Sequence, residues 1–293
     1  MLIFVVLEVL VMQATKEGIG RRTHQFYLKE TFMYFSTLRI VTLLAVFITM
    51  ACVSHSQADV NNTQLVNKAG MQRMLSQQIA KAYFYSGSEI YSKEAGLQRD
   101  MALYRFEKNH TLLKENVRDI ETRDLLSIVD STFSEYTALV KKPYKENATR
   151  VLELSETLLE VCHSVVQNIQ EFTGANIDHI INVSGKQRML SQRVAKNYIA
   201  YQAGFRDEGT VQKLNDSVQD FEAGLNKLIG EKRNNGEIKS LLLKIKKEWD
   251  RVSPYFLKVR KGGLSIMVLT ATDEITKLSD RVTGLYVDTI TTK

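Results

Sequence analysis

A seventeen-residue stretch that occurs twice constrains the fold of this 293-residue chain more than any other feature. The first copy runs from Asn67 to Tyr83 (NKAGMQRMLSQQIAKAY) and the second from Asn182 to Tyr198 (NVSGKQRMLSQRVAKNY), with 11 identities in 17 positions. The offset of 115 residues is the same at every position. Self-similarity at a fixed offset indicates a tandem duplication, so the fold should contain one helical unit twice.

Each copy, placed on a helix, has two distinct faces. One face has the i, i+4, i+7 spacing of a core-facing stripe, formed by Leu75, Ile79 and Ala82 and, in the second copy, by Leu190, Val194 and Asn197. The other has heptad spacing with small residues and one arginine, formed by Ala69, Arg73, Ser76, Ala80 and Tyr83 and by Ser184, Arg188, Ser191, Ala195 and Tyr198. Small side chains allow a second helix to approach closely, which would leave each guanidinium partly dehydrated.

A dehydrated arginine requires a negative partner, and two kinds of partner are open here. The planar guanidinium suits a flat oxyanion or a carboxylate, and it does not lose its proton to escape the cost of burial. The alternative is a structural ion pair with a protein acid, for which Glu107 and Glu222 stand at equivalent repeat positions. Residue type alone favours the ion pair, because most interior arginines are paired with protein carboxylates.

The rest of the chain predicts an all-α protein. Only 2 Pro and 15 Gly interrupt a helical periodicity that runs nearly throughout, and no alternating strand pattern is evident. Four helical stretches recur in each repeat, and short Gly-, Asn- or Pro-containing breaks separate them. We therefore expect two tandem four-helix up-and-down bundles. In the first, the stretches run to about residue 86, from about 95 to 117, from about 121 to 141, and onward from about 148.

The expected boundaries place three helices of the first repeat in residues 59–147, its fourth helix in 148–174, and the second repeat in 175–293. Only Gly174 and Gly185 interrupt the helical pattern between Arg150 and Ala203, so a long continuous helix should join the bundles. The bundles could then stack end to end. A side-by-side arrangement, with Arg73 facing Arg188 across a pseudo-two-fold axis, stays open.

The N-terminal region resembles a secretory signal. Residues 33–58 have a short polar start, an apolar run and small polar residues before Ala58, after which cleavage is expected. Residues 1–32 are interpreted as an extension before the true start at Met33. A periplasmic location follows, while an uncleaved segment that tethers the protein to the membrane is the less favoured alternative, and Cys52 lies in a poor lipid-attachment context.

Several functional classes find little support in the sequence. A net charge of +6, spread among acidic residues, gives no basic run interleaved with aromatics, so no nucleic-acid partner is predicted. We expect no enzyme activity, metal or cofactor, because there is no phosphate loop or nucleophile elbow and the histidines do not form metal-ligand pairs (His55, His110, His163 and His179). Cys162 should be a buried small hydrophobe, and Met71, Met74 and Met189 should belong to the core.

The repeated pattern Asn-x-x-Gly-x-Gln-Arg-Met-Leu-Ser-Gln-x-x-Ala-Lys resembles the signature of PilJ-type domains, the N-terminal sensing domains of type IV pili methyl-accepting chemotaxis transducers. It is similar also to the periplasmic domains of NarX/NarQ-type nitrate sensor kinases. The resemblance covers residues 59–293 in two tandem copies and is strong over both motifs. It implies a periplasmic four-helix bundle that binds nitrate or a related small anion between two motif helices.

The resemblance also implies which residues bind. The motif arginine corresponds to Arg73 and Arg188, and Gly70 and Gly185 would allow close helix approach. A mid-helix glycine costs about 1 kcal/mol relative to alanine, so a packing or ligand role is expected at both. Ser76 and Ser191 complete the expected site. The second motif is the more basic, because Lys186 and Arg193 replace Met71 and Gln78, so we expect the second copy to bind the anion.

The expected function is therefore a periplasmic module that senses a nitrate- or nitrite-like anion. No kinase, receptor coiled coil or second membrane span follows the repeats in this sequence, so the signal is expected to pass to a separate membrane receptor or sensor kinase. A homodimer is left open. The competing interpretation is a helical interaction or scaffold protein without a small-molecule ligand.

Overall fold

The computed structural model describes residues 62–88, 92–142, 144–173, 179–263 and 265–291. The expected N-terminal extension and signal peptide lie outside the described residues. Within the described part there are eight α-helices, one short 3₁₀ helix and no strand, so the prediction of an all-α protein is confirmed. The helices belong to one compact unit, residues 60–293.

The first four helices match the predicted elements to within a few residues. They are α3 (Asn62–Gly87), α4 (Ser92–Asn116), α5 (Ile120–Val140) and α6 (Tyr144–Phe172). The fourth starts at Tyr144, one turn earlier than the predicted start near residue 148, directly after the break that contains Pro143.

The remaining helices follow the same pattern. They are α7 (His179–Gln202), α8 (Glu208–Ile229), α9 (Gly236–Leu257), the 3₁₀ turn η1 (Val259–Lys261) and α10 (Ser265–Thr291). Gly204, with φ of 112°, adopts a backbone conformation that glycine favours in the turn between α7 and α8.

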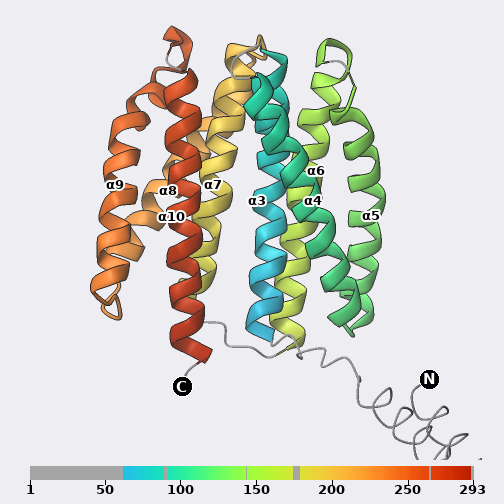
Figure 1. The fold of residues 1–293 in the computed structure, drawn as a ribbon, viewed down its shortest axis with the longest axis vertical. Helices are drawn as coiled ribbons and strands as arrows, with labels where there is room; N and C mark the ends of the chain where they lie inside the picture. The colour runs from blue at the N-terminus through green and yellow to red at the C-terminus, as the bar shows by residue number, and fades with distance from the viewer. Residues whose placement is uncertain (1–61, 89–91, 143, 174–178, 264, 292–293) are drawn as a thin grey trace, which may run out of the picture. The chain divides into compact units, whose positions relative to one another are not determined.

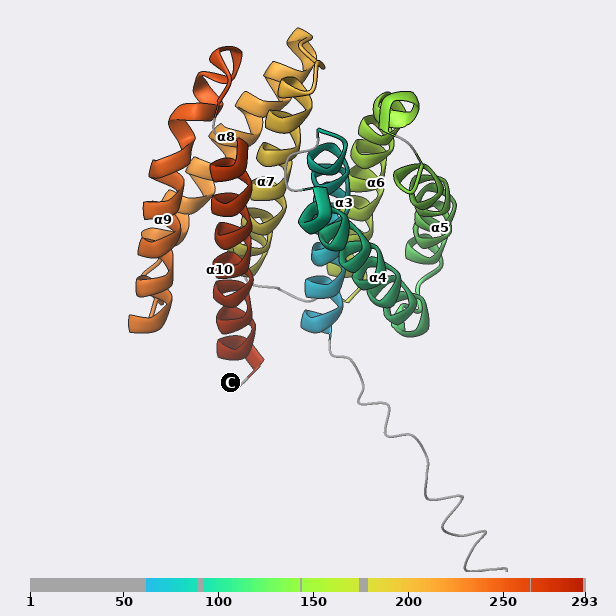
Figure 2. The ribbon, with the colours of Figure 1, turned by 45° about the horizontal axis from the view of Figure 1, so that its top comes forward.

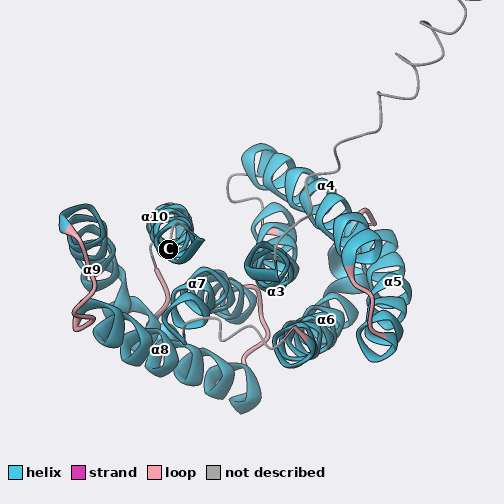
Figure 3. Cartoon of the chain, turned by 90° about the horizontal axis from the view of Figure 1, so that it is seen from below, coloured by secondary structure: helices cyan, strands magenta, loops and turns pink. Residues whose placement is uncertain are grey.

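The helices alternate in direction, and the two that carry the repeated motif lie side by side (Figure 1). Helix α3 packs against α4, α6 and α7, while α7 packs against α8, α10 and α3. A view along the helices shows α3 and α7 in the middle of the molecule with the other helices around them (Figure 3). The neighbouring position of α3 and α7 is equally clear after a 45° rotation (Figure 2).

The predicted continuous helix between the repeats is wrong. Helix α6 ends at Phe172, the amide of Thr173 still donates to Ile169 O, and α7 begins at His179 and runs in the opposite direction to α6 (Figure 1). The two motif helices are thereby parallel neighbours. Their polar residues bond to each other, and this pairing is incompatible with end-to-end stacking.

Positions related by the sequence offset play matching structural roles in the two sets of helices. Phe106 and Phe133 stack with ring centroids 4.1 Å apart, and Phe221 and Trp249, which lie 115 and 116 residues further on, stack at 4.0 Å. The N-cap of α5 is Asp119, which accepts from the Thr122 amide, and Asn235 caps α9 in the same way, 116 residues later.

The motif helices are buried almost all round, including many of their polar residues. The predicted core stripes are confirmed, because their members range from 0 to 3% exposed. Met74, Met189 and Cys162 are also buried, and Met71 packs partly against the core. Buried polar side chains need partners. The contacts of the motif polar residues therefore define the candidate site.

Candidate functional site

Both motif arginines lie in the interface between α3 and α7. Arg73 is 4% exposed and Arg188 is 1% exposed. A β-carbon placed at Gly70 would lie 3.4 Å from Arg73 Nη2 and 3.8 Å from Arg188 Nη2, so both guanidiniums approach this glycine. Gly185 lies beside Arg188, whose Nη2 would be 3.3 Å from a β-carbon there. The Arg188 guanidinium near Gly70 comes from the other motif helix, whereas the neighbour of Gly185 comes from its own helix, so a role of both glycines in close helix approach stays a prediction.

Arg188 is neutralised by the protein itself. Its Nη1 donates to Asp280 Oδ1 at 2.5 Å, across the interface between α7 and α10. Its Nη2 donates to Asn67 Oδ1 at 2.9 Å, which links α7 to α3. The second motif arginine thus has a carboxylate partner, although that partner is not the expected Glu222, whose Oε1 accepts from Trp249 Nε1.

Arg73 has no acidic partner among the described residues. Its Nη1 lies 3.1 Å from His163 Nδ1, and because a guanidinium only donates, the imidazole nitrogen accepts. Its Nη2 reaches Asn182 Oδ1 at 3.4 Å, and its buried Nε has no hydrogen-bond partner. The alternative in which Glu107 neutralises Arg73 is therefore not what the structure shows.

The surroundings weaken the proton affinity of these groups. Burial, together with the charge of Arg188, lowers the pKa of Arg73 to about 10, which still leaves it protonated at neutral pH. Burial also lowers the pKa of His163, and Arg73 and Lys186 lower it further. His163 is therefore neutral near pH 7, and the Arg73 charge is left without a counter-charge.

The two arginines differ in charge balance because one residue type differs between the repeats. His163 and Asp280 are 117 residues apart, the same offset that relates Val151 and Leu152 to Val268 and Leu269. Each contacts the motif arginine from the last helix of its own set. The asparagines that open the two motifs bond across the interface. Asn182 accepts from Arg73, and Asn67 accepts from Arg188, so each asparagine contacts the arginine of the other copy.

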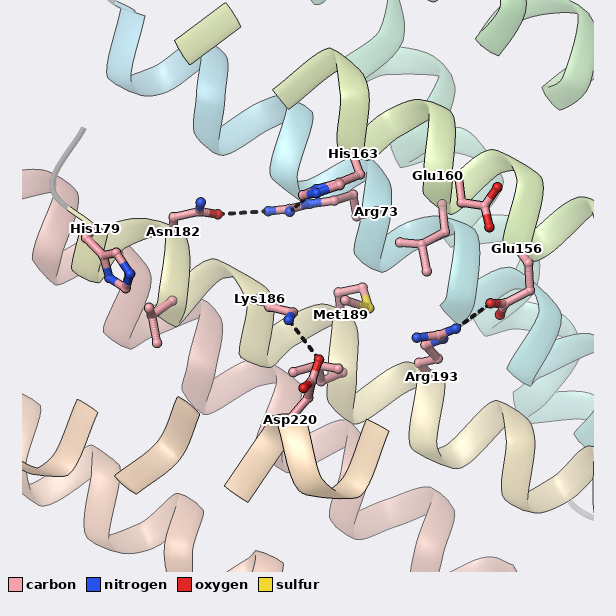
Figure 4. Close-up of a pocket in the computed structure, with 13 residues that line it drawn as sticks. Arg73, Glu156, Glu160, His163, His179, Asn182, Lys186, Met189, Arg193 and Asp220 are labelled. Carbon is pink, nitrogen blue, oxygen red and sulfur yellow. Dashed lines mark hydrogen bonds and ion pairs between the residues drawn. The ribbon is translucent and has the colours of Figure 1, made fainter. Parts of the chain in front are cut away.

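An open cleft of about 590 Å³ leads to Arg73 between α6, α7 and α8 (Figure 4). His163 and Asn182 flank the Arg73 guanidinium in the cleft wall. The cleft also carries two ion pairs, between Lys186 and Asp220 at 2.8 Å and between Arg193 and Glu156 at 2.6 Å. Its remaining lining is Leu159, Glu160, His179, Val183, Met189 and Leu190.

A smaller cleft of about 250 Å³ lies at the corresponding place in the other half, beside Asp280. Several of its lining residues correspond by offset to residues of the larger cleft: Met74 to Met189, Gln78 to Arg193, Asp273 to Glu156, and Lys277 to Glu160. The two sides of the α3 and α7 interface are thus equivalent in position but different in chemistry.

Two buried lysines link the two sets of helices. Lys81 on α3 pairs with Asp273 on α10, and Lys196 on α7 pairs with Glu156 on α6. Burial lowers the pKa of Lys196 to about 8 despite its acidic partner. Burial alone would raise the pKa of Glu156, but Lys196 and Arg193 outweigh it and hold the pKa at about 2.

Three predicted site residues are engaged elsewhere. Ser76 Oγ donates to Arg73 O and Ser191 Oγ to Arg188 O, both at 2.9 Å, so these hydroxyls bond to backbone rather than to the guanidiniums. Ser191 Oγ also lies 2.6 Å from Thr276 Oγ1. Arg193 lines the cleft but is paired with Glu156. Ligand binding by the seven predicted residues stays a prediction.

Residues 175–277 match the PilJ family, which is described as the N-terminal part of type IV pili methyl-accepting chemotaxis transducers. This match supports a PilJ-type domain there. The matched segment includes α7, α8, α9 and the first half of α10, and it contains Arg188. The PilJ description names signalling proteins, in agreement with the predicted sensing class. No curated protein and no solved structure matches this chain.

The partners of the arginines were not predicted from the sequence, although the repeat offset relates them to each other. His163 and Asp280 become visible only when the fourth helices of the repeats are aligned at the offset of 117. Asn67 and Asn182 belong to the motif signature itself. Among the described residues, no cluster suited to a metal ion occurs and no helix is long and apolar enough to cross a membrane.

Proposed function

We propose that this chain is a small-anion binding and sensing module in which Arg73 supplies the binding charge. The observation that carries the proposal is a guanidinium, 4% exposed, at the wall of a cleft and bonded only to neutral groups within the described part of the chain. Burying an unpaired charge is costly. An anion that enters the cleft would remove that cost and would meet donors already in place.

The surroundings of Arg73 favour a flat, singly charged oxyanion. A guanidinium presents coplanar donors that suit planar oxygen acceptors, and both nitrate and nitrite meet this requirement. The likeness of the motif to nitrate sensor kinases supports the same class. Arg188 adds a second guanidinium near Gly70, but Asp280 already balances its charge. This favours Arg73, rather than the more basic second motif, as the main anion contact.

We further propose that both sets of helices are PilJ-type units that arose by duplication. The 11 identities in 17 motif positions and the matching aromatic stacks and N-caps support this. The family description supports a role in signalling, and we propose a membrane receptor or sensor kinase as the partner. A periplasmic location, reached through a signal peptide at residues 33–58, fits that role. Cell fractionation and N-terminal sequencing test this location. The expected result is a periplasmic chain that starts at Asp59.

Isothermal titration of the purified protein with nitrate, nitrite and propionate tests the binding proposal. We expect saturable binding by at least one of them, lost in Arg73→Ala. Arg150→Ala is the matched control, because it removes an exposed arginine that pairs with Glu135 and does not line the cleft. Its affinity should change less than threefold. Heat indistinguishable from dilution for every anion would contradict the proposal.

The scaffold interpretation is the second candidate, and the Arg188 pair with Asp280 favours it. If the helix faces that carry Arg73 and Arg188 served only packing, Arg73 would be a buried charge without function. Arg73→Met should then raise the free energy of unfolding and change no binding property. The anion proposal predicts instead that Arg73→Met removes the stabilisation of the protein by added anion.

A further inference from the structure

We infer that the anion is an organic monocarboxylate, held by its carboxyl group on Arg73 with its apolar body in the cleft between α6 and α7. This inference rests on the proposed anion-binding function and narrows it to one ligand class. Its basis is the comparison of Arg73 with Arg188 and the character of the cleft wall.

The protein shows which group an arginine at this position accepts. Asp280 places a carboxylate oxygen 2.5 Å from Arg188 Nη1, and His163 occupies the corresponding position beside Arg73. Asp280 is thus an internal stand-in for a ligand carboxylate. Where histidine replaces that carboxylate, the guanidinium keeps its position in the fold and faces an open cleft.

The cleft suits a ligand with an apolar portion. Its volume of about 590 Å³ exceeds the need of a three- or four-atom inorganic ion. Apolar side chains from both bordering helices line it, namely Leu159 on α6 and Val183, Met189 and Leu190 on α7. Met189 lies on the cleft side of α7, between Arg73 and Arg193 in the view of Figure 4. A methionine accommodates ligand chains of different shape because its side chain is flexible.

The charges in the cleft favour a single carboxylate. Lys186 pairs with Asp220 and Arg193 with Glu156, which leaves Arg73 as the positive group without an acidic partner among the described lining residues. Glu160, one turn from His163 on the same helix, would oppose a second negative group. A dicarboxylate should therefore bind more weakly than a monocarboxylate of equal length.

Isothermal titration with acetate, propionate, butyrate and valerate, alongside nitrate and succinate at constant sodium concentration, tests the inference on the unmodified protein. Affinity should rise about fourfold for each added methylene that the cleft buries. Succinate should bind more weakly than butyrate. Nitrate binding equal to or tighter than valerate, with no dependence on chain length, would overturn the inference but leave the anion-binding function intact. If none of these six anions binds, both the monocarboxylate inference and the proposed anion-binding function are overturned.

Two variants test the role of the internal carboxylate. His163→Asp should supply Arg73 with its own carboxylate and weaken butyrate binding at least tenfold, without loss of the helical circular dichroism signal. Asp280→His should expose Arg188 and raise the stoichiometry from one butyrate per chain to two. Unchanged affinity in His163→Asp would overturn the inference. Should Asp280→His not fold, Asp280→Asn provides the second measurement, and rescue of its stability by butyrate but not by chloride is the expected result.

Discussion

His163 and Asp280 hold corresponding positions on α6 and α10, and each contacts the motif arginine of its own set of helices. His163 Nδ1 lies 3.1 Å from Arg73 Nη1, and Asp280 Oδ1 lies 2.5 Å from Arg188 Nη1. The second contact balances a buried charge, whereas the first does not. One exchange of side chain thus separates a neutralised arginine from one that lacks a counter-charge.

Asp280→Asn should destabilise the protein by about 2 to 3 kcal/mol, because it leaves Arg188 buried without a counter-charge. The half-exposed position of Asp280 keeps the cost at the lower end of the range for buried pairs. His163→Asn, the matched control, exchanges one neutral partner for another and should cost less than about 1 kcal/mol. Urea unfolding followed by the fluorescence of Trp249, the only tryptophan, measures both. Equal losses would contradict the charge argument.

Gly70→Ala should separate stability from binding. Alanine in a helix is favoured over glycine by up to about 1 kcal/mol, so the melting temperature should stay level or rise. The new methyl group would lie 3.4 Å from Arg73 Nη2 and 3.8 Å from Arg188 Nη2, in the space beside both guanidiniums. Anion affinity should fall about tenfold, as measured by titration. Gly96→Ala, at a site with nothing near its β-carbon, is the control and should leave affinity unchanged.

Anion binding should strengthen as the pH falls from 7 toward 5.5. Burial, Arg73 and Lys186 lower the pKa of His163 in the free protein, and a bound anion would raise it, so binding takes up a proton. Nitrate is the suitable ligand because it does not titrate in this range. His163→Asn should remove the dependence. His179→Asn controls for the other cleft histidine, and a loss of the dependence in this variant alone would contradict the assignment.

Glu156 should govern part of the acid stability. Its pKa of about 2 lies below the ordinary value of 4.5, so its ionised form stabilises the folded state. That contribution, about 3 kcal/mol, is complete above pH 4.5 and is lost as the pH falls toward 2. Glu156→Gln should therefore be less stable than the unmodified protein at pH 7, and the difference should shrink through this window. A difference independent of pH would show that the ion pairs with Lys196 and Arg193 do not hold this pKa down.

The features that depend on helical periodicity were predicted correctly from the sequence. The helices, the core stripe through Leu75 and Ile79, and the burial of the motif arginines all follow from spacing along one helix, and the structure agrees with them. The continuous helix was wrong because local propensity between residues 150 and 203 says nothing about which surfaces pair. The bonds of Arg73 to Asn182 and of Arg188 to Asn67 bring α3 and α7 together, and that contact spans more than 100 residues of sequence.

The expectation that the second motif binds the anion depended on counting basic residues within the motif. Lys186 and Arg193 do make that copy more basic, but Asp220 and Glu156 from neighbouring helices form ion pairs with them. The balance of charge around each arginine depends on the fourth helix of its set. This charge balance can be read only from the fold, which places His163 beside Arg73 and Asp280 beside Arg188.

Nuclear magnetic resonance of the arginine side chains tests the central claim most directly, because the buried Nε of Arg73 has no hydrogen-bond partner. The Arg73 Nε–H signal, assigned by its disappearance in Arg73→Lys, should shift saturably when butyrate or nitrate is added. The Nε of Arg193 is also without a partner, but Glu156 holds its Nη2, so the Arg193 signal should move much less. An Arg73 signal that stays fixed while the anions are raised to high millimolar concentration would contradict the claim that this arginine binds an external anion.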